Sequence, residues 1–498
     1  MLLEANRRAV ASREPRSVWD LFAGISSIPR PSKKETAIIA HVRDLAARRG
    51  LAVREDLAGN LVIDVPATPG RERATPVVLQ AHLDMVCEKD AHVAHDFDAE
   101  GIRLVADVDA KTGARIVRAD GTTLGADNGL GVALALAAAF SPDVVHGQME
   151  VLLTVDEETG LTGARCLGPD TFRGRRLVNL DTEEDDTITI GCAGGCDTDV
   201  TWRFPATPAA PGEEVYRVAV SGLRGGHSGG DIHENRGNAI RLLARLLWAA
   251  RDSGPRLGPF SGGNKRNAIP REAEAIVAIP AAARAALEAA AEGVRRAAAS
   301  ESNEPDAVVS VERAASGQRF ASAADTRRVA SGIVGFPCGV IEMHPSLPGL
   351  VRTSNNVSTV HSKIEDSTLQ VSVGNLSRSS NESSLDDASD RLTAVGELAG
   401  ATVRHENRYP GWDPDVGSEL LASARRVYRE LFDADPKVLA VHAGLECGII
   451  GERVGRLEAI SIGPTVLGAH SPTERAFVDS LGRAWRYLQA LLADLARG

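Results

Sequence analysis

Several histidines and acidic residues of this chain follow apolar segments, where they could together bind metal ions. In an extended strand alternate side chains share a face, so His82 and Asp84 would project together from the end of one strand. Imidazole and carboxylate ligands suit Zn²⁺, Mn²⁺ or Co²⁺, and the number of carboxylates is enough for two metals that share a bridge. The set contains no cysteine, which disfavours a structural zinc site. Its members are His82, Asp84, Asp127, Glu157, Glu158, Asp181 and His470.

The elements that must position these residues are apolar strands and glycine-rich loops. In an open α/β sheet, ligands bind outside the carboxyl ends of the strands, which is where most of the set would lie. Asp127 is in the glycine-rich loop 119–129, ahead of a helix predicted over 132–140, and an Asp in that position is most often an N-cap. His470 is in a loop before a terminal helix predicted over 475–495. The predicted strands are 77–86, 149–155 and 176–180.

The length of 498 residues exceeds what one hydrophobic core usually supports, so more than one domain is expected. Strands alternate with helices in the middle of the chain, which indicates an inserted domain. Ser32 and Glu35 have the spacing of a capping box ahead of a helix over 37–49. We predict an α/β fold: a mixed, largely parallel sheet flanked by helices, with an inserted α+β domain. The expected divisions are 1–210, 211–399 and 400–498.

The composition excludes some classes of function. Hydrophobic residues make up 43% and charged residues 25%, as in ordinary globular proteins. A net charge of -11 and only 4% aromatic residues disfavour binding to nucleic acid or to anionic membranes. The sequence contains no apolar run of membrane-spanning length and no signal-peptide pattern, so cytoplasmic residence is expected.

The motifs, taken in their order along the chain, resemble those of the dinuclear-metal M20 peptidases. Among these the sequence is most similar to the aminoacyl-histidine dipeptidase branch. The resemblance covers essentially the whole chain, and the motifs together are highly specific. The matching segments are 28–32, 82–85, 125–129, 156–160, 179–181, 226–231, 442–448, 463–465 and 468–472.

The resemblance implies a zinc-peptidase-like catalytic domain and a role for each member of the set. One ion would be bound by His82 and Asp181 and the other by Glu158 and His470, with Asp127 bridging the two. Asp84 would orient the His82 imidazole and raise its basicity. Glu157 would take a proton from the metal-bridging water and return it to the leaving amine. Two divalent cations, Zn²⁺ before Mn²⁺ or Co²⁺, are the implied cofactors.

The inserted domain corresponds to the lid of the family, through which a homodimer is expected. His227 would polarise the scissile carbonyl, in its own active site or in that of a partner subunit. Asn267 and Arg378 would contact the substrate, with the arginine clamping the carboxylate of the peptide. His442 and Glu446 match a motif near the substrate pocket.

The resemblance implies metal-dependent hydrolysis of small peptides, with Xaa-His (carnosine-like) dipeptides as the expected substrates. Another M20 amide hydrolase, a tripeptidase or an N-acyl amino acid deacylase, is the nearer alternative. A non-catalytic metal or peptide binder on the same scaffold is the alternative from a different class, and it predicts the loss of a ligand or of the base. All seven residues are present.

Overall fold

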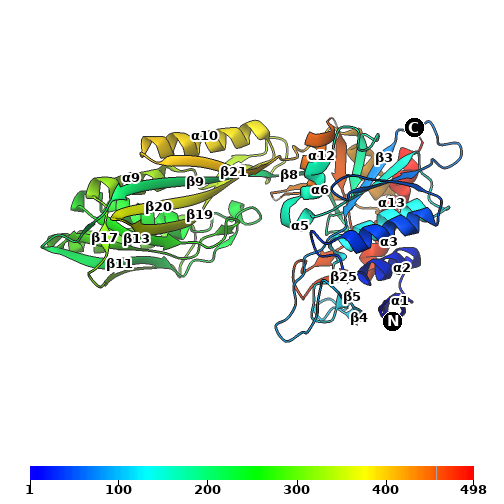
Figure 1. Ribbon diagram of the computed structural model, residues 1–498. Helices are drawn as coiled ribbons and strands as arrows, with labels where there is room; N and C mark the ends of the chain where they lie inside the picture. The colour runs from blue at the N-terminus through cyan, green and yellow to red at the C-terminus, as the bar shows by residue number, and fades with distance from the viewer. Residues whose placement is uncertain (443, 456, 498) are drawn as a thin grey trace. The chain divides into compact units, whose positions relative to one another are not determined.

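The structure is a computed structural model that describes residues 1–442, 444–455 and 457–497. The chain forms two compact units (Figure 1). The first consists of Met1–Gly191, Pro414–Ala440 and Leu445–Gly498, and the second of Cys192–Asp413 and Val441–Gly444. The expected lid boundaries, 211 and 399, fall inside the second unit. The reason is that β9 (Gly194–Pro205) and β21 (Thr402–Tyr409) pair within the sheet of that unit.

The first unit is built on an eight-stranded mixed sheet. Its four central strands run parallel, and the strands outside them pair antiparallel wherever a register is defined. β3 and β6 are buried along their whole length, as expected for strands covered on both faces. In sheet order the strands are β1 (Ala52–Glu55), β2 (Leu61–Val65), β6 (Met149–Thr154), β3 (Val77–His82), β7 (Arg176–Asn179), β23 (Glu458–Ser461), β8 (Thr187–Cys192) and β22 (Lys437–Val441).

Helices flank this sheet, as the sequence predicts (Figure 1). The alanine- and leucine-rich helix α4 (Ala126–Phe140) is buried for most of its length and packs against β3. A smaller sheet consists of β24 (Val466–Leu467), β25 (Arg475–Phe477), β5 (Arg115–Ala119) and β4 (Leu104–Val108). The other helices are α1 (Leu2–Val10), α2 (Arg16–Ser26), α3 (Thr36–Ala47), α5 (Glu157–Gly160), α6 (Thr162–Cys166), α11 (Glu419–Phe432), α12 (Glu446–Val454) and α13 (Val478–Leu495).

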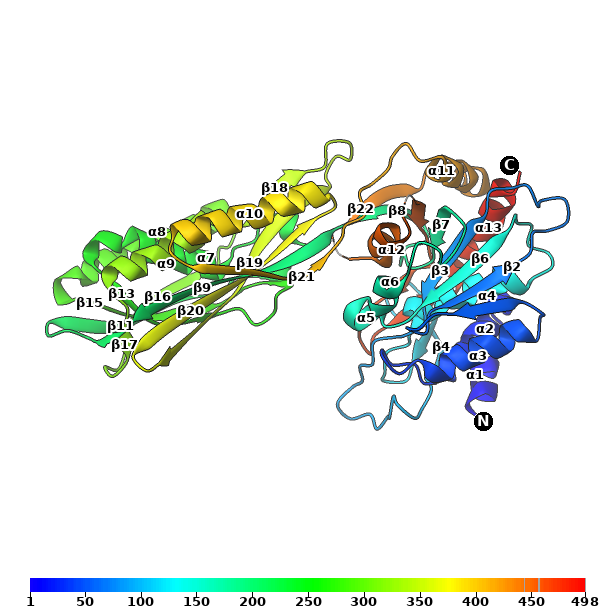
Figure 2. The same cartoon turned by 45° about the horizontal axis from the view of Figure 1, so that its top comes forward.

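The second unit is an antiparallel sheet with helices on one face. Figure 2 shows α7 (Ala239–Ala249), α8 (Arg284–Glu301), α9 (Ala323–Gly335) and α10 (Glu382–Leu398) along one side of it. Side chains of these helices and of the strands share one apolar core. The main path of the sheet is β16 (Val308–Arg313), β11 (Glu213–Ser221), β15 (Ala273–Pro280), β13 (Arg256–Gly262), β19 (Val351–Glu365), β20 (Thr368–Ser379), β9 and β21, with β18 (Gly339–Met343) on β19.

The alternation of strands and helices predicted for the inserted domain is present as a βαββαβ unit. In chain order it consists of β11, α7, β13, β15, α8 and β16, and an antiparallel neighbour separates each parallel pair of strands. Two short ladders lie outside the main sheet: β12 (Gly226–His227) with β14 (Ala268–Ile269), and β10 (Thr207–Pro208) with β17 (Arg319–Phe320). Within the described residues, none of the helices combines the length and apolar character needed to cross a bilayer.

Candidate metal centre and substrate groups

Three neighbouring parallel strands bring most of the predicted set to one edge of the sheet in the first unit. β3 lies between β6 and β7, and it ends at His82. Asp84 follows directly, while Glu157 and Glu158 begin α5 just after β6. Asp181 comes just after the end of β7. The carboxyl ends of the strands therefore converge as the sequence predicts.

Asp127 lies between two histidines that are far apart in the sequence. Its Oδ1 atom is 3.1 Å from Nε2 of His82, and its Oδ2 atom is 3.1 Å from Nε2 of His470. On the first side, Oδ1 of Asp181 lies 3.6 Å from Nε2 of His82. On the second side, Oε2 of Glu158 lies 3.0 Å from Nε2 of His470. The five side chains thus form two groups of ligand type that share one carboxylate.

These donors fit a pair of divalent cations. Ligand atoms of His82, Asp127 and Glu158 all lie within 4.8 Å of one another. Oε1 of Glu158 is buried and accepts no hydrogen bond from any described residue. A buried carboxylate oxygen without a donor is destabilising unless a cation or another partner satisfies it. Imidazole and carboxylate are also the ligands that Zn²⁺, Mn²⁺ and Co²⁺ accept.

The charges of the protein alone show how strongly the site favours cations. Hydrogen bonds that the His470 ring donates to Asp127 and Glu158 raise the pKa of His470 to about 11. Burial lowers the pKa of His82, but Asp181 and Asp127 outweigh burial and raise that pKa well above its ordinary value. Protonated imidazoles therefore balance the carboxylates where a metal would otherwise do so.

Asp84 holds the backbone and the imidazole of the site together. Its Oδ1 atom lies 3.3 Å from Nδ1 of His82, on the side of the ring opposite Asp127. It accepts backbone N–H bonds from Glu157 at 3.0 Å and from Glu158 at 3.2 Å. Burial opposes ionisation, yet the neighbouring His82 imidazole and the hydrogen bond from Ser32 lower the pKa of Asp84 to about 2. Asp84 is therefore an ionised, fully buried carboxylate.

Glu157 has the electrostatic surroundings of a proton carrier. Burial, together with the charges of Asp181, Glu446 and Glu158, raises its pKa well above the ordinary value. A carboxyl group with a raised pKa can both accept and return a proton near neutral pH.

The capping box predicted at Ser32 and Glu35 is wrong, because both side chains have other partners. Ser32 Oγ donates to Asp84 at 2.7 Å. Glu35 accepts from the backbone N–H of Asp156 at 3.0 Å, and α3 has no side-chain cap. The segment before α3 therefore supports the metal centre and does not cap its own helix.

Glu446 is buried in the first unit. It is only 1% exposed, and Gln80 and Thr154 each donate to its Oε2 atom at 2.6 Å. Burial raises its pKa to about 7. Its charge also contributes to the raised pKa of Glu157.

Some residues near the centre were not singled out from the sequence. Glu183 belongs to an acidic run that reads as a solvated surface, yet burial and the charges of Asp127 and Asp181 raise its pKa to about 8. Arg30 and Glu474 are each 2% exposed and hydrogen-bond the loops that carry the predicted ligands. Only two features of the sequence point to these residues. Arg30 stands between two prolines, and Glu474 lies four positions after His470.

In the second unit, the short β12–β14 ladder joins His227 to the segment of Asn267. His227 pairs with Ala268, and the backbone N–H of Ser228 donates to the Asn267 carbonyl at 2.8 Å. Nδ1 of His227 accepts from the N–H groups of Gly229 and Gly230 at 3.2 and 3.0 Å. Burial and then the charge of Arg378 lower the pKa of His227. The imidazole is therefore neutral, with its proton on Nε2.

Arg378 is a buried cation without a carboxylate partner among the described residues. It is 5% exposed, its Nη1 donates to the Tyr409 hydroxyl at 3.0 Å, and its Nε has no acceptor. The charge of Arg378 also acts on His442, whose Nε2 atom lies 2.7 Å from Oγ of Ser354. Burial and then the charge of Arg378 lower the pKa of His442 to about 3. A buried guanidinium beside neutral imidazoles is suited to an anionic group of a ligand.

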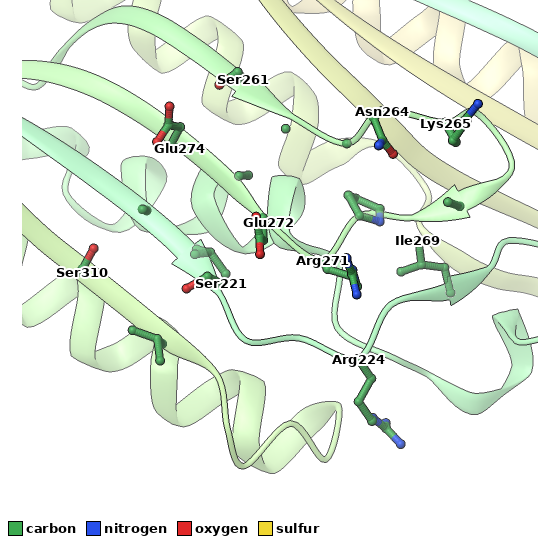
Figure 3. A pocket seen from close by; sticks show the side chains of 18 of the residues that line it. Ser221, Arg224, Ser261, Asn264, Lys265, Ile269, Arg271, Glu272, Glu274 and Ser310 are labelled. Carbon is green, nitrogen blue, oxygen red and sulfur yellow. The ribbon is translucent and has the colours of Figure 1, made fainter. Parts of the chain in front are cut away.

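A large open pocket of about 960 Å³ lies elsewhere in the second unit. Figure 3 shows its lining side chains, which include Arg224, Arg271, Lys265 and Glu274. It reaches Gly226 and Ala268 of the short ladder but includes none of the predicted site residues.

Comparison with known proteins gives matches over nearly the whole chain. Residues 218–305 match the model of a peptidase dimerisation domain, M20_dimer. The cytosol non-specific dipeptidase of Escherichia coli is 38% identical, over 97% of this chain and 98% of its own. The crystal structure of the aminoacylhistidine dipeptidase of Vibrio alginolyticus is also 38% identical, with a TM-score of 0.90 over 97% of each chain. A tripeptidase from Staphylococcus aureus, at 16% identity and a TM-score of 0.60, shares the fold over 98% of this chain and 100% of its own. Identity at this level, along both units and in the same order, shows that this chain belongs to the M20 family of metallopeptidases.

Proposed function

We propose that this protein hydrolyses dipeptides with two divalent cations bound between His82 and His470. The observation that carries the proposal is Asp127, whose two oxygens each face one histidine at 3.1 Å. His82 and Asp181 would bind one ion, Glu158 and His470 the other, and Asp127 both. We propose Zn²⁺ as the native metal, with Mn²⁺ and Co²⁺ as alternatives that the same donors accept.

Bound there, the cations supply Lewis acidity, which polarises the scissile carbonyl and lowers the pKa of the attacking water. Glu157 takes a proton from that water on its carboxylate and returns it to the nitrogen of the leaving amine. The raised pKa of Glu157 supports this assignment, because the group must bind and release a proton in each cycle. Asp84 would keep the His82 ring in its present orientation, with Nε2 toward Asp127, so that this nitrogen could bind a cation.

His227 would donate a hydrogen bond from its Nε2–H to the carbonyl oxygen, where negative charge develops. Its support is the neutral tautomer that Gly229 and Gly230 impose. Arg378 would bind the carboxylate of the peptide, and Asn267 and His442 would contact the substrate beside these groups. The charge of Glu446 would help to raise the pKa of Glu157.

We propose Xaa-His dipeptides, carnosine-like ones among them, as substrates. The support is the similarity to the aminoacylhistidine dipeptidase over both units. Cytoplasmic residence is proposed on the similarity to the cytosol dipeptidase of Escherichia coli. A homodimer through the second unit is proposed on the match to a dimerisation domain, and light scattering of the purified protein would measure it.

A substrate panel tests the function. The protein is stripped of metal with a chelator, reloaded in turn with Zn²⁺, Mn²⁺ or Co²⁺, and assayed on Xaa-His dipeptides, other dipeptides, tripeptides and N-acyl amino acids. We expect the highest kcat/KM with dipeptides. Without metal we expect no hydrolysis. Faster turnover of tripeptides or of N-acyl amino acids would replace the proposal by that activity. No hydrolysis of any member would leave a metal or peptide binder.

A further inference from the structure

The Glu474 carboxylate holds the loop that carries Asp127. Its two oxygens accept four backbone N–H bonds, at 2.7, 2.9, 2.7 and 3.2 Å, from residues 124–127 in turn. The side chain is 2% exposed, so water does not share these bonds. Because Glu474 follows His470 in the same loop, it ties the segment of one proposed ligand to the segment of another.

Arg30 ties the same loop to the end of β3. Its Nη1 donates to the carbonyls of Leu83 and Asp84 at 2.9 and 2.8 Å, and its Nη2 donates to the Gly125 carbonyl. Arg30 is also 2% exposed.

Two glycines of the loop make room for this guanidinium. A Cβ at Gly125 would lie 2.5 Å from Nη2 of Arg30, and one at Gly129 would lie 2.7 Å from it. Gly125 also has a φ of +67°, which L side chains rarely adopt. The glycine-rich loop is thus built around Arg30.

We propose that Arg30 and Glu474 are positioning residues of the metal centre. Their side chains contact backbone atoms of the segments that carry His82 and Asp127, Glu474 itself belongs to the segment of His470, and neither residue is assigned as a ligand. Both side chains bind the 124–127 loop, Glu474 accepting from its N–H groups and Arg30 donating to its carbonyl. Together they fix the distance between the two histidines that Asp127 spans. This inference rests on the metal-binding part of the proposed function and not on the identity of the substrate.

The test measures metal binding directly. Metal-free protein is titrated with Co²⁺, whose visible absorption reports coordination geometry, in the presence of a competing chelator. Glu474→Gln keeps the size of the side chain but turns one acceptor into a donor that faces N–H groups. Arg30→Lys keeps the charge but loses the guanidinium group, whose two Nη atoms connect the end of β3 to Gly125. For each variant we expect Co²⁺ affinity to fall roughly 10- to 100-fold, with a changed absorption spectrum.

Glu150→Gln is the matched control. Glu150 is also buried and accepts two backbone N–H bonds, from Arg173 and Gly174, but it lies near the opposite end of β6. We expect this control to lower the thermal midpoint while leaving the affinity and spectrum of bound Co²⁺ as in the wild type. Should Glu474→Gln fail to fold, Arg30→Lys decides the test.

Wild-type affinity and spectrum in the folded variants would overturn the proposal, and so would an equal loss in Glu150→Gln. Wild-type protein that binds two Co²⁺ ions but cleaves no dipeptide would defeat the proposed function alone. Wild-type protein that binds no metal would defeat both.

Discussion

Nδ1 of His82 lies 3.3 Å from the Oδ1 atom of Asp84, so the ring is held from behind while its Nε2 faces Asp127. The same carboxylate accepts the backbone N–H groups of Glu157 and Glu158. The buried Asp84 carboxylate therefore orients the proposed ligand His82 and also holds the backbone at the proposed base, Glu157. Its loss would disturb two parts of the site at once.

Asp84→Asn is expected to weaken metal affinity by roughly 10- to 100-fold, because the amide cannot stabilise the His82 ring as a carboxylate does. Equilibrium dialysis with metal analysis would measure the change. Asp64→Asn is the control, since Asp64 pairs with Arg54 and Arg173 and not with the site. Equal affinity of Asp84→Asn and Asp64→Asn would contradict the role of Asp84.

Glu157→Gln is expected to lower kcat by about 10²- to 10⁴-fold, since the amide can neither take up nor return the proton. Metal content should stay at the wild-type value, because Glu157 is not a proposed ligand. Steady-state assays on metal-loaded protein, with metal content measured in parallel, check both expectations. Unaltered turnover would remove Glu157 from the mechanism.

Metal binding is expected to release protons. Without metal, the raised pKa values keep His82 and His470 protonated at pH 7, and a ligand nitrogen must lose its proton. About two protons per chain should leave on binding two ions. Calorimetric titration in buffers of different ionisation enthalpy would count them, and heat independent of the buffer would refute the prediction. Activity should correspondingly fall in acid, and a flat profile down to about pH 5 would speak against histidine ligation.

Glu446 is expected to make the metal-free protein less stable as pH rises. Its folded pKa of about 7 lies above the ordinary pKa of 4.5, so its contribution is fully present below 4.5 and is lost as pH rises through about 7. The difference corresponds to about 3 kcal/mol at higher pH. Urea unfolding with chelator at pH 5 and pH 8 should show a smaller pH dependence for Glu446→Gln. An unchanged pH dependence would mean that Glu446 ionises freely in the folded protein.

Arg378→Met is expected to raise KM for dipeptides roughly tenfold or more, because the carboxylate loses a charged partner. Dipeptide amides, which lack that charge, should be affected less. Arg352→Met is the control, because Arg352 is paired with Glu342 in the same unit. If amides and free dipeptides lost affinity equally, Arg378 would not be the carboxylate site.

The proposed ligands and the base could be predicted from the sequence because each stands next to a local signal. His82 and Glu157 follow apolar strands, and Asp127 and His470 lie in glycine-containing loops. The supporting residues gave no such signal, since their partners are remote: Glu474 bonds backbone atoms about 350 positions earlier. Ser32 has the local spacing of a cap, but Asp84 competes for its hydroxyl. Local pattern thus predicts candidate ligands and a candidate base, while the contacts that hold these residues in place depend on the complete fold.

The sheet of the first unit has its strands drawn from both ends of the chain. β23 lies between β7 and β8, yet the whole second unit is translated before it. Domains generally fold from the N-terminus during synthesis. A nascent chain therefore contains β7 and β8 before β23, the strand between them, has been synthesised. His470 leaves the ribosome later still. The order of translation therefore delays completion of the proposed metal centre until the second unit and His470 have been synthesised, and a chain that has not reached His470 would lack one proposed ligand.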